Sequence, residues 1–206
     1  MDTIFALIIL LFSTVIHEIA HGSVANLLGD STAKNSGRLS LNPLKHLDPF
    51  GSVILPFFLY ISYTLSGTTG PILGWAKPVP VNPFNLRDQK WGMLKVSIAG
   101  PLTNFSIALI FGLLVRFLPS PSQLTVFFSL ISIYNLVWAL FNLIPIPPLD
   151  GSHVLFFFLP EKFRQFKEVL GQYSSIILIL FIVFGLNLVY SAAIFLFSII
   201  TGLKIY

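Results

Sequence analysis

The sequence predicts an all-α, polytopic integral membrane protein with four to six membrane segments and short membrane-associated loops or strands. Two observations lead to this prediction. Hydrophobic residues make up 55% of the chain and charged residues only 10%, whereas an ordinary soluble domain has about 25% charged residues. The apolar residues also gather in tracts long enough to cross a bilayer, so lipid must be the solvent for much of the chain.

The first predicted span covers residues 3–28, which Gly29 and Asp30 then end. At about 1.5 Å per residue, this tract would be roughly 39 Å long, enough to span with some tilt. Only Asp2 precedes it, without the basic residues of a secretory signal. We therefore expect the tract to stay in the membrane as a helix.

Four further apolar segments are predicted, at residues 51–65, 91–118, 124–144 and 173–203. The first of them is short and contains Pro56, so it is either a spanning helix extended by its flanks or a re-entrant piece. Gly185 and Asn187 interrupt the last one, which predicts a long kinked helix or two shorter pieces. We expect residues 1–206 to form a single membrane-embedded domain.

Residues 67–90 are rich in glycine and proline and cannot form a regular helix. Extended strands, or a loop lying against the membrane face, are the expected forms. Non-helical backbone is not stable when exposed to lipid, so this segment must be shielded by protein or reach water. We expect Lys77, Pro78 and Pro80 to lie in a stretch that contacts substrate, whose edge could pair with an unwound substrate strand.

The first span carries the motif His17-Glu18-Ile19-Ala20-His21. Histidines four residues apart lie on one face of a helix, one turn apart, so both rings can reach one metal ion. The motif predicts a zinc site in which Glu18 is the general base for a zinc-activated water. Ionisable side chains inside a span are costly, roughly 2.5–3.5 kcal/mol for a central charge. A functional role is therefore favoured over polar pairing alone.

A catalytic zinc held by two histidines needs a third protein ligand. The chain has no cysteine, so a carboxylate is the expected ligand. Asp150 is the strongest candidate because it follows a proline-broken helix end, and Gly151 allows a tight turn after it. The other acidic residues are Asp2, Glu18, Asp30, Asp48, Asp88, Glu161 and Glu168.

The net charge of +4 does not indicate nucleic-acid binding, because the basic residues are scattered singly between apolar runs. This pattern is typical of loop charges near anionic lipid headgroups, so membrane lipid is an expected partner. Asp2 precedes the first span, whereas Lys34, Arg38 and Lys45 follow it. The positive-inside rule then places the amino terminus outside and the histidine-bearing end toward the cytoplasm, although the second loop is also basic.

Together, these motifs resemble the site-2 protease family of intramembrane zinc metalloproteases. HEIAH resembles the family's zinc motif, and NLIPIPPLDG resembles its second signature. AGPLTN, SLNPLKHLDPFG and GWAKPVPVNP also match family elements, so the likeness covers nearly the whole chain. The resemblance implies that His17, His21 and Asp150 are the metal ligands, with one Zn2+ per chain, and that Glu18 is the catalytic glutamate.

The resemblance further implies a hydrolase of the prokaryotic cell membrane, with multiple spans, that performs regulated intramembrane proteolysis on a transmembrane protein substrate. The chain resembles the family's short subgroup without a PDZ domain. We include Asn142 and Asn104 among the catalytic candidates, since their amides could hydrogen-bond substrate backbone or the oxyanion. Interhelical hydrogen bonding is the alternative for both.

Two other functions remain open from the sequence. A metal or proton transporter could use the intramembrane His, Glu and Asp residues as a path, but neither internal repeats nor several polar helices are evident. A membrane protein that only binds partners would have no need of Glu18 as a base. The sequence does not indicate the oligomeric state.

Overall fold

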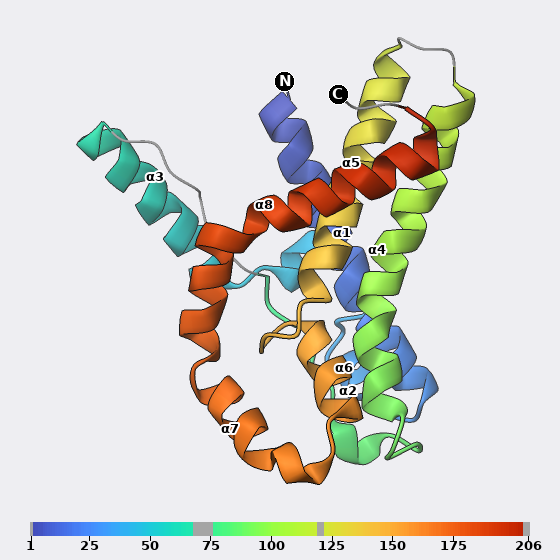
Figure 1. Cartoon of the computed structure of the whole chain (residues 1–206), viewed down its shortest axis with the longest axis vertical. Helices are drawn as coiled ribbons and strands as arrows, with labels where there is room; N and C mark the ends of the chain where they lie inside the picture. The colour runs from blue at the N-terminus through green and yellow to red at the C-terminus, as the bar shows by residue number, and fades with distance from the viewer. Residues whose placement is uncertain (1, 68–75, 119–121, 204–206) are drawn as a thin grey trace.

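The computed structural model describes residues 2–67, 76–118 and 122–203 (Figure 1). Within them the chain is helical, and its strand-like pairing is limited to one antiparallel bridge between Leu47 and Ala76. The α-helices are α1 (Asp2–Leu27), α2 (Thr32–Asn35), α3 (Leu55–Ser66), α4 (Gly92–Phe117), α5 (Gln123–Asn142), α6 (Asp150–Phe158), α7 (Arg164–Gln172) and α8 (Ser174–Thr201). The shorter turns are η1 (Pro43–His46), η2 (Pro49–Ile54), η3 (Pro83–Asn85) and η4 (Glu161–Phe163).

The predicted all-α membrane architecture is confirmed. Five of the described helical stretches are long and apolar enough to cross a membrane, namely Phe5–Leu27, Pro49–Ser66, Gly92–Phe117, Gln123–Asn142 and Ser174–Thr201. The second stretch reaches this length because the π-helical η2 runs directly into α3. The short apolar segment at 51–65 is therefore a helix extended at its amino-terminal flank.

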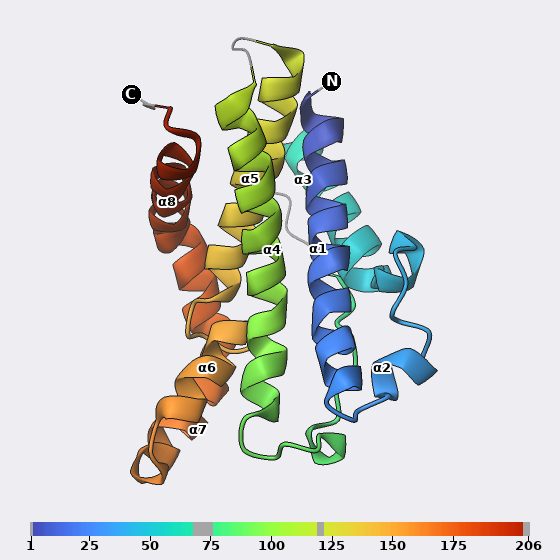
Figure 2. The same cartoon turned by 90° about the vertical axis from the view of Figure 1, so that its right-hand side faces the viewer.

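Three helices, α1, α4 and α5, stand side by side and form the centre of the molecule (Figure 2). α8 packs against α4 and α5 on the side that faces away from α1, and small side chains allow the helices to pack closely there. Ala108, Leu136 and Ala193 are buried there with Phe197. Ser132 Oγ of α5 donates to the Ala108 carbonyl at 2.8 Å, which joins α5 to α4 by a polar contact inside this apolar cluster.

The two remaining membrane helices have few protein neighbours. α3 extends away from the central helices, and α8 bends as it crosses them (Figure 1). α8 is one continuous helix. Of the two forms expected for this segment, the long kinked helix is therefore the one observed, and the pair of shorter helices is not. The ring of Phe181 lies over Gly185, where an added Cβ would meet it at 2.5 Å. Outward-facing leucine and phenylalanine side chains along both helices are exposed, as lipid contact requires.

The glycine- and proline-rich segment lies partly outside the described residues, at 68–75. Its described part, from residue 76, is a loop, apart from the bridge at Ala76 and the turn η3. The charged stretch at 161–168, between α6 and α8, is helical as well, because η4 and α7 cover it. α7 exposes Phe166 and Val169 among polar residues, the pattern of a helix lying in the membrane interface.

Asp30 joins the loop that follows residue 76 to the carboxyl-terminal end of α1. It is fully buried, and its carboxylate accepts hydrogen bonds from the backbone N–H of Thr32 at 3.1 Å and of Asn82 at 2.7 Å, and from the Asn85 amide at 3.0 Å. Burial acts to raise the pKa of Asp30. The hydrogen bonds from the Thr32 hydroxyl, Asn82 and Asn85 outweigh burial, so the pKa lies below its ordinary value of 3.8.

We predict that Asp30→Asn lowers the free energy of unfolding by about 2 kcal/mol at neutral pH, because several donors lose a charged acceptor. The folded-state pKa is lowered, so the wild-type advantage is complete above pH 3.8 and declines as the pH falls through that value toward the folded pKa. Thermal unfolding of the detergent-solubilised variants across pH measures this, with Glu161→Gln as the control. An Asp30→Asn protein as stable as wild type at neutral pH would contradict the assignment.

Candidate metal centre

The two motif histidines lie on one face of α1, where that helix packs against α4. Both rings are buried, and their centroids are 4.6 Å apart in an edge-to-face arrangement. The spacing of four residues therefore produces the predicted geometry, with both Nε2 atoms directed toward one point.

Asp150 reaches the same point from a part of the chain that is distant in sequence. α5 ends at Asn142, a loop follows, and Asp150 is the first residue of α6. Gly151 is pressed against the end of α5, where a Cβ would lie 2.1 Å from the Leu143 carbonyl oxygen. Only glycine allows this close approach, so Gly151 fixes the backbone that presents the Asp150 carboxylate.

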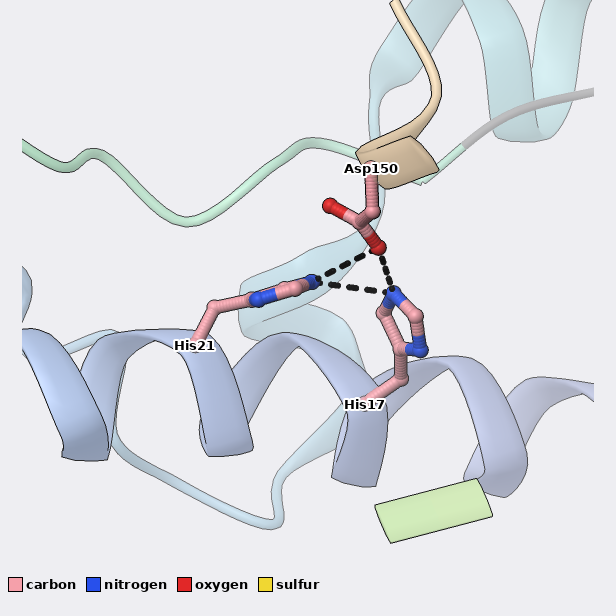
Figure 3. Close-up of side chains that lie close together, drawn as sticks. All are labelled: His17, His21 and Asp150. Atoms are coloured by element: carbon pink, nitrogen blue, oxygen red, sulfur yellow. Dashed lines mark hydrogen bonds and ion pairs between the residues drawn. The ribbon is translucent and has the colours of Figure 1, made fainter. Parts of the chain in front are cut away.

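The three side chains converge in a nearly equilateral triangle (Figure 3). His17 Nε2 lies 3.0 Å from His21 Nε2. Asp150 Oδ2 lies 3.1 Å from His17 Nε2 and 3.2 Å from His21 Nε2. Among the described residues, these three form the group that could hold a metal ion. The three sequence-predicted ligands are thus brought together.

The hydrogen bonds on the other ring nitrogens define the protonation of the imidazoles. His21 Nδ1 lies 2.7 Å from the Val96 carbonyl, which can only accept, so Nδ1 carries the proton. His17 Nδ1 lies 2.6 Å from Asn104 Oδ1. The Asn104 amide nitrogen donates to the Ser13 carbonyl at 3.2 Å, which orients its oxygen toward His17. When such a ring is neutral, its Nε2 is therefore the unprotonated nitrogen that can bind a metal.

Three lone-pair donors that face one another at such distances repel each other unless a proton or a metal cation lies between them. Two imidazole nitrogens and one carboxylate oxygen are a donor set that zinc accepts in catalytic sites. A tetrahedral zinc with bonds of about 2.0–2.1 Å keeps its ligand atoms roughly 3.3 Å apart, close to the triangle seen here. His17, His21 and Asp150 can therefore hold a zinc ion.

Gly100 leaves the space for these rings on α4. A Cβ at this position would lie 2.4 Å from His21 Nε2 and 2.6 Å from His17 Nε2. Gly100 belongs to the AGPLTN motif, whose Asn104 lies one turn further along α4 and bonds His17. The same stretch of α4 thus provides the space for both histidine rings, at Gly100, and the hydrogen-bond acceptor that orients the His17 ring, at Asn104.

Glu18 is only partly buried and points to the described loop at 76–81. Its Oε2 accepts a hydrogen bond from the Val79 backbone N–H at 2.7 Å. A carboxylate has about four acceptor sites, so this single bond leaves capacity for a further proton or hydrogen bond. The loop expected to contact substrate is therefore in direct contact with the expected general base.

The two asparagine candidates have different surroundings. Asn104 is fully buried, and both its N–H groups are engaged, by the Ser13 carbonyl and by Asn135 Oδ1 at 2.8 Å. Asn104 therefore forms hydrogen bonds between helices and positions His17, as in the alternative role considered from the sequence. Neither of its N–H groups is left to bind an oxyanion. Asn142 donates to the Trp138 carbonyl of its own helix at 2.9 Å, and no described contact links it to the metal-binding side chains.

Two further α5 residues near the site are absent from the sequence-based candidates. Asn135 links Asn104 to its own helix, because its amide donates to the Ile131 carbonyl at 2.8 Å. Trp138 lies edge-on to His17, with ring centroids 6.5 Å apart. Asn135 shares the signal of Asn104, an amide within an apolar span. The contact of Trp138 has no such signal, since aromatic residues occur throughout this chain.

Comparison with known proteins gives the family. The model of Peptidase family M50 matches residues 120–186, which include Asp150. The chain is 38% identical to "Putative zinc metalloprotease YwhC" of Bacillus subtilis (strain 168), over 86% of this chain and 80% of that protein. It is 30% identical to "Putative zinc metalloprotease Rip2" of Mycolicibacterium smegmatis, over 95% of this chain and 73% of that protein. No solved structure matches the chain significantly.

The fold and these relatives define a multi-pass membrane zinc metalloprotease. The chain belongs to peptidase family M50, the site-2 protease family that the sequence motifs resemble. The bacterial relatives fit the expected location in a prokaryotic membrane.

We predict that Gly100→Ala abolishes zinc binding, because the added Cβ would occupy space held by the two Nε2 atoms. Zinc content after purification, measured by plasma mass spectrometry, tests this. Gly171→Ala is the matched control, since a Cβ there meets nothing within 4 Å. A folded Gly100→Ala protein with the zinc content of this control would contradict the site.

Proposed function

We propose that this protein is an intramembrane zinc metalloprotease that hydrolyses peptide bonds of membrane-spanning proteins. His17, His21 and Asp150 hold one zinc ion per chain, and Glu18 is the general base. The observation that carries the proposal is the convergence of two Nε2 lone pairs and one carboxylate oxygen, 3.0–3.2 Å apart, inside the central helices.

The depth of the site supports a membrane-embedded substrate. His17 lies well inside the span Phe5–Leu27, roughly 18 Å from its start at 1.5 Å per residue. A peptide bond in an intact helix has its carbonyl hydrogen-bonded and covered by the next turn. A substrate helix must therefore unwind locally before its backbone can reach the site.

The chain's own residues have separate roles in this reaction. Zinc, when bound, polarises the scissile carbonyl and activates water as a nucleophile. Glu18 takes the proton of the attacking water and transfers it to the leaving amine. The Val96 carbonyl and Asn104 hold the histidine rings so that Nε2 remains available throughout.

Substrate backbone is expected to bind along residues 77–81, which form no regular secondary structure and reach Glu18 through Val79. Pro78 and Pro80 lack a backbone N–H, so Val79 N–H is the donor between them, and Glu18 accepts it at 2.7 Å. An arriving strand that takes over this donor would release Glu18 for proton transfer. Asn142, at the end of α5, remains a candidate for a contact with substrate.

Hydrolysis is favoured over the alternative of metal or proton transport. The relatives are named as zinc metalloproteases, and redox-silent zinc suits hydrolysis. Glu18 lies beside two metal-binding histidines. Hydrolysis needs such a base to transfer a proton to the leaving group, whereas transport of an ion does not need one.

We predict that Glu18→Gln keeps its zinc but cleaves a panel of single-span substrates at least roughly 10²-fold more slowly than wild type, because a general base is lost. Detergent-purified proteins are compared by substrate cleavage on gels and by zinc content. Glu168→Gln, an exposed residue that pairs with Arg164 at 3.0 Å, is the matched control. Cleavage by Glu18→Gln at the wild-type rate, or a wild-type protein without zinc, would overturn the proposal.

A further inference from the structure

A basic pocket lies apart from the metal-binding triangle, between the loop that follows α2 and residues 77–80. It is an open cavity of about 450 Å³, within the size range of small-molecule sites. Among the described residues, its walls include three cationic side chains and no acidic one. The residues that form them include Ser36, Arg38, Lys45, Lys77, Pro78 and Pro80.

The three cations of this basic pocket have no acidic partner. Within the part of the chain that the structure describes, neither Arg38 nor the two lysines takes part in an ion pair. Lys45 and Lys77 are exposed, and Arg38 is only 9% exposed. Three positive charges thus surround one cavity without compensation, which makes it attractive to an anion.

Arg38 shows that the pocket is built and not a chance gathering of surface lysines. Its guanidinium donates to the carbonyls of Lys45, of Lys77 at 2.6 Å and of Pro78 at 3.1 Å. These acceptors are neutral, and its buried Nε–H has no partner among the residues that the structure describes. A buried guanidinium that bonds only carbonyls keeps its full charge, which a bound anion would neutralise.

We propose that this basic pocket binds a phosphate group. Guanidinium and ammonium groups together are the usual protein partners of phosphate, and the cavity is larger than phosphate alone requires. The same chemistry is offered by free phosphate and by the headgroup of an anionic phospholipid. The loop that carries Arg38 and Lys45 follows the first span on its expected cytoplasmic side, where anionic lipids are found.

The position of the pocket connects it to Glu18. Arg38 holds the Lys77 and Pro78 carbonyls, and the next residue, Val79, donates its N–H to Glu18 at 2.7 Å. A phosphate group bound in the pocket therefore contacts the same short segment as the proposed general base. The binding site itself does not depend on the proposed proteolysis, so each can fail without the other.

The test uses Lys45→Ala/Lys77→Ala in the full-length protein, because neither lysine side chain forms a described hydrogen bond, whereas Arg38 joins two loops. Lys90→Ala/Lys162→Ala removes the same charge elsewhere and is the matched control. Binding of inorganic phosphate is measured in detergent by calorimetry against chloride at equal ionic strength. Binding of phosphatidylglycerol is measured by native mass spectrometry against phosphatidylcholine.

The expected result is that the pocket variant binds the phosphate ligand about tenfold or more weakly than wild type and the control. A difference seen with inorganic phosphate identifies soluble phosphate as a ligand, and a difference seen only with phosphatidylglycerol identifies the lipid headgroup. The proposal is wrong if wild type binds neither ligand, or if the pocket variant and the control bind equally.

Discussion

The direction of the two histidine Nε2 lone pairs is the constraint on which the rest of the structure depends. The Val96 carbonyl and Asn104 Oδ1 each hold one Nδ1 proton, so both Nε2 atoms face the Asp150 carboxylate. These contacts require α4 to pass close to α1. Close passage in lipid cannot rely on the hydrophobic effect between helices and needs small residues at the contact.

The fold meets this requirement with few elements. Glycine on α4 gives the histidine rings room, and Gly151 lets α6 begin directly beneath the end of α5. The proline-broken α5–α6 connection is non-helical backbone beside the buried site, a form that a membrane protein tolerates only where protein or water satisfies it. α3 and the bent α8 have large exposed apolar faces, which suit contact with lipid.

The sequence predicted four to six membrane segments, a range that includes the five described here, and it predicted the three side chains that converge. Both predictions rest on local hydrophobicity or on the cost of ionisable groups inside a membrane. It did not predict the contacts of Val96 or of Val79, since these are made by backbone groups that every residue possesses. The role of Asn104 could be narrowed only by geometry. Asn135, like Asn104, is an amide within an apolar span. Its hydrogen bond to Asn104 joins α5 to α4, a pairing between helices that the sequence alone does not show.

The central claim is that one zinc ion is bound by two imidazoles and one carboxylate. Zinc K-edge X-ray absorption on the detergent-purified protein tests it most directly, together with the same measurement on Asp150→Asn and His17→Ala. We expect one zinc per chain, with nitrogen and oxygen neighbours at about 2.0–2.1 Å and two imidazole contributions in wild type. We expect both variants to lose this signal. A wild-type protein without bound zinc, or an unchanged two-imidazole signal in His17→Ala, would contradict it.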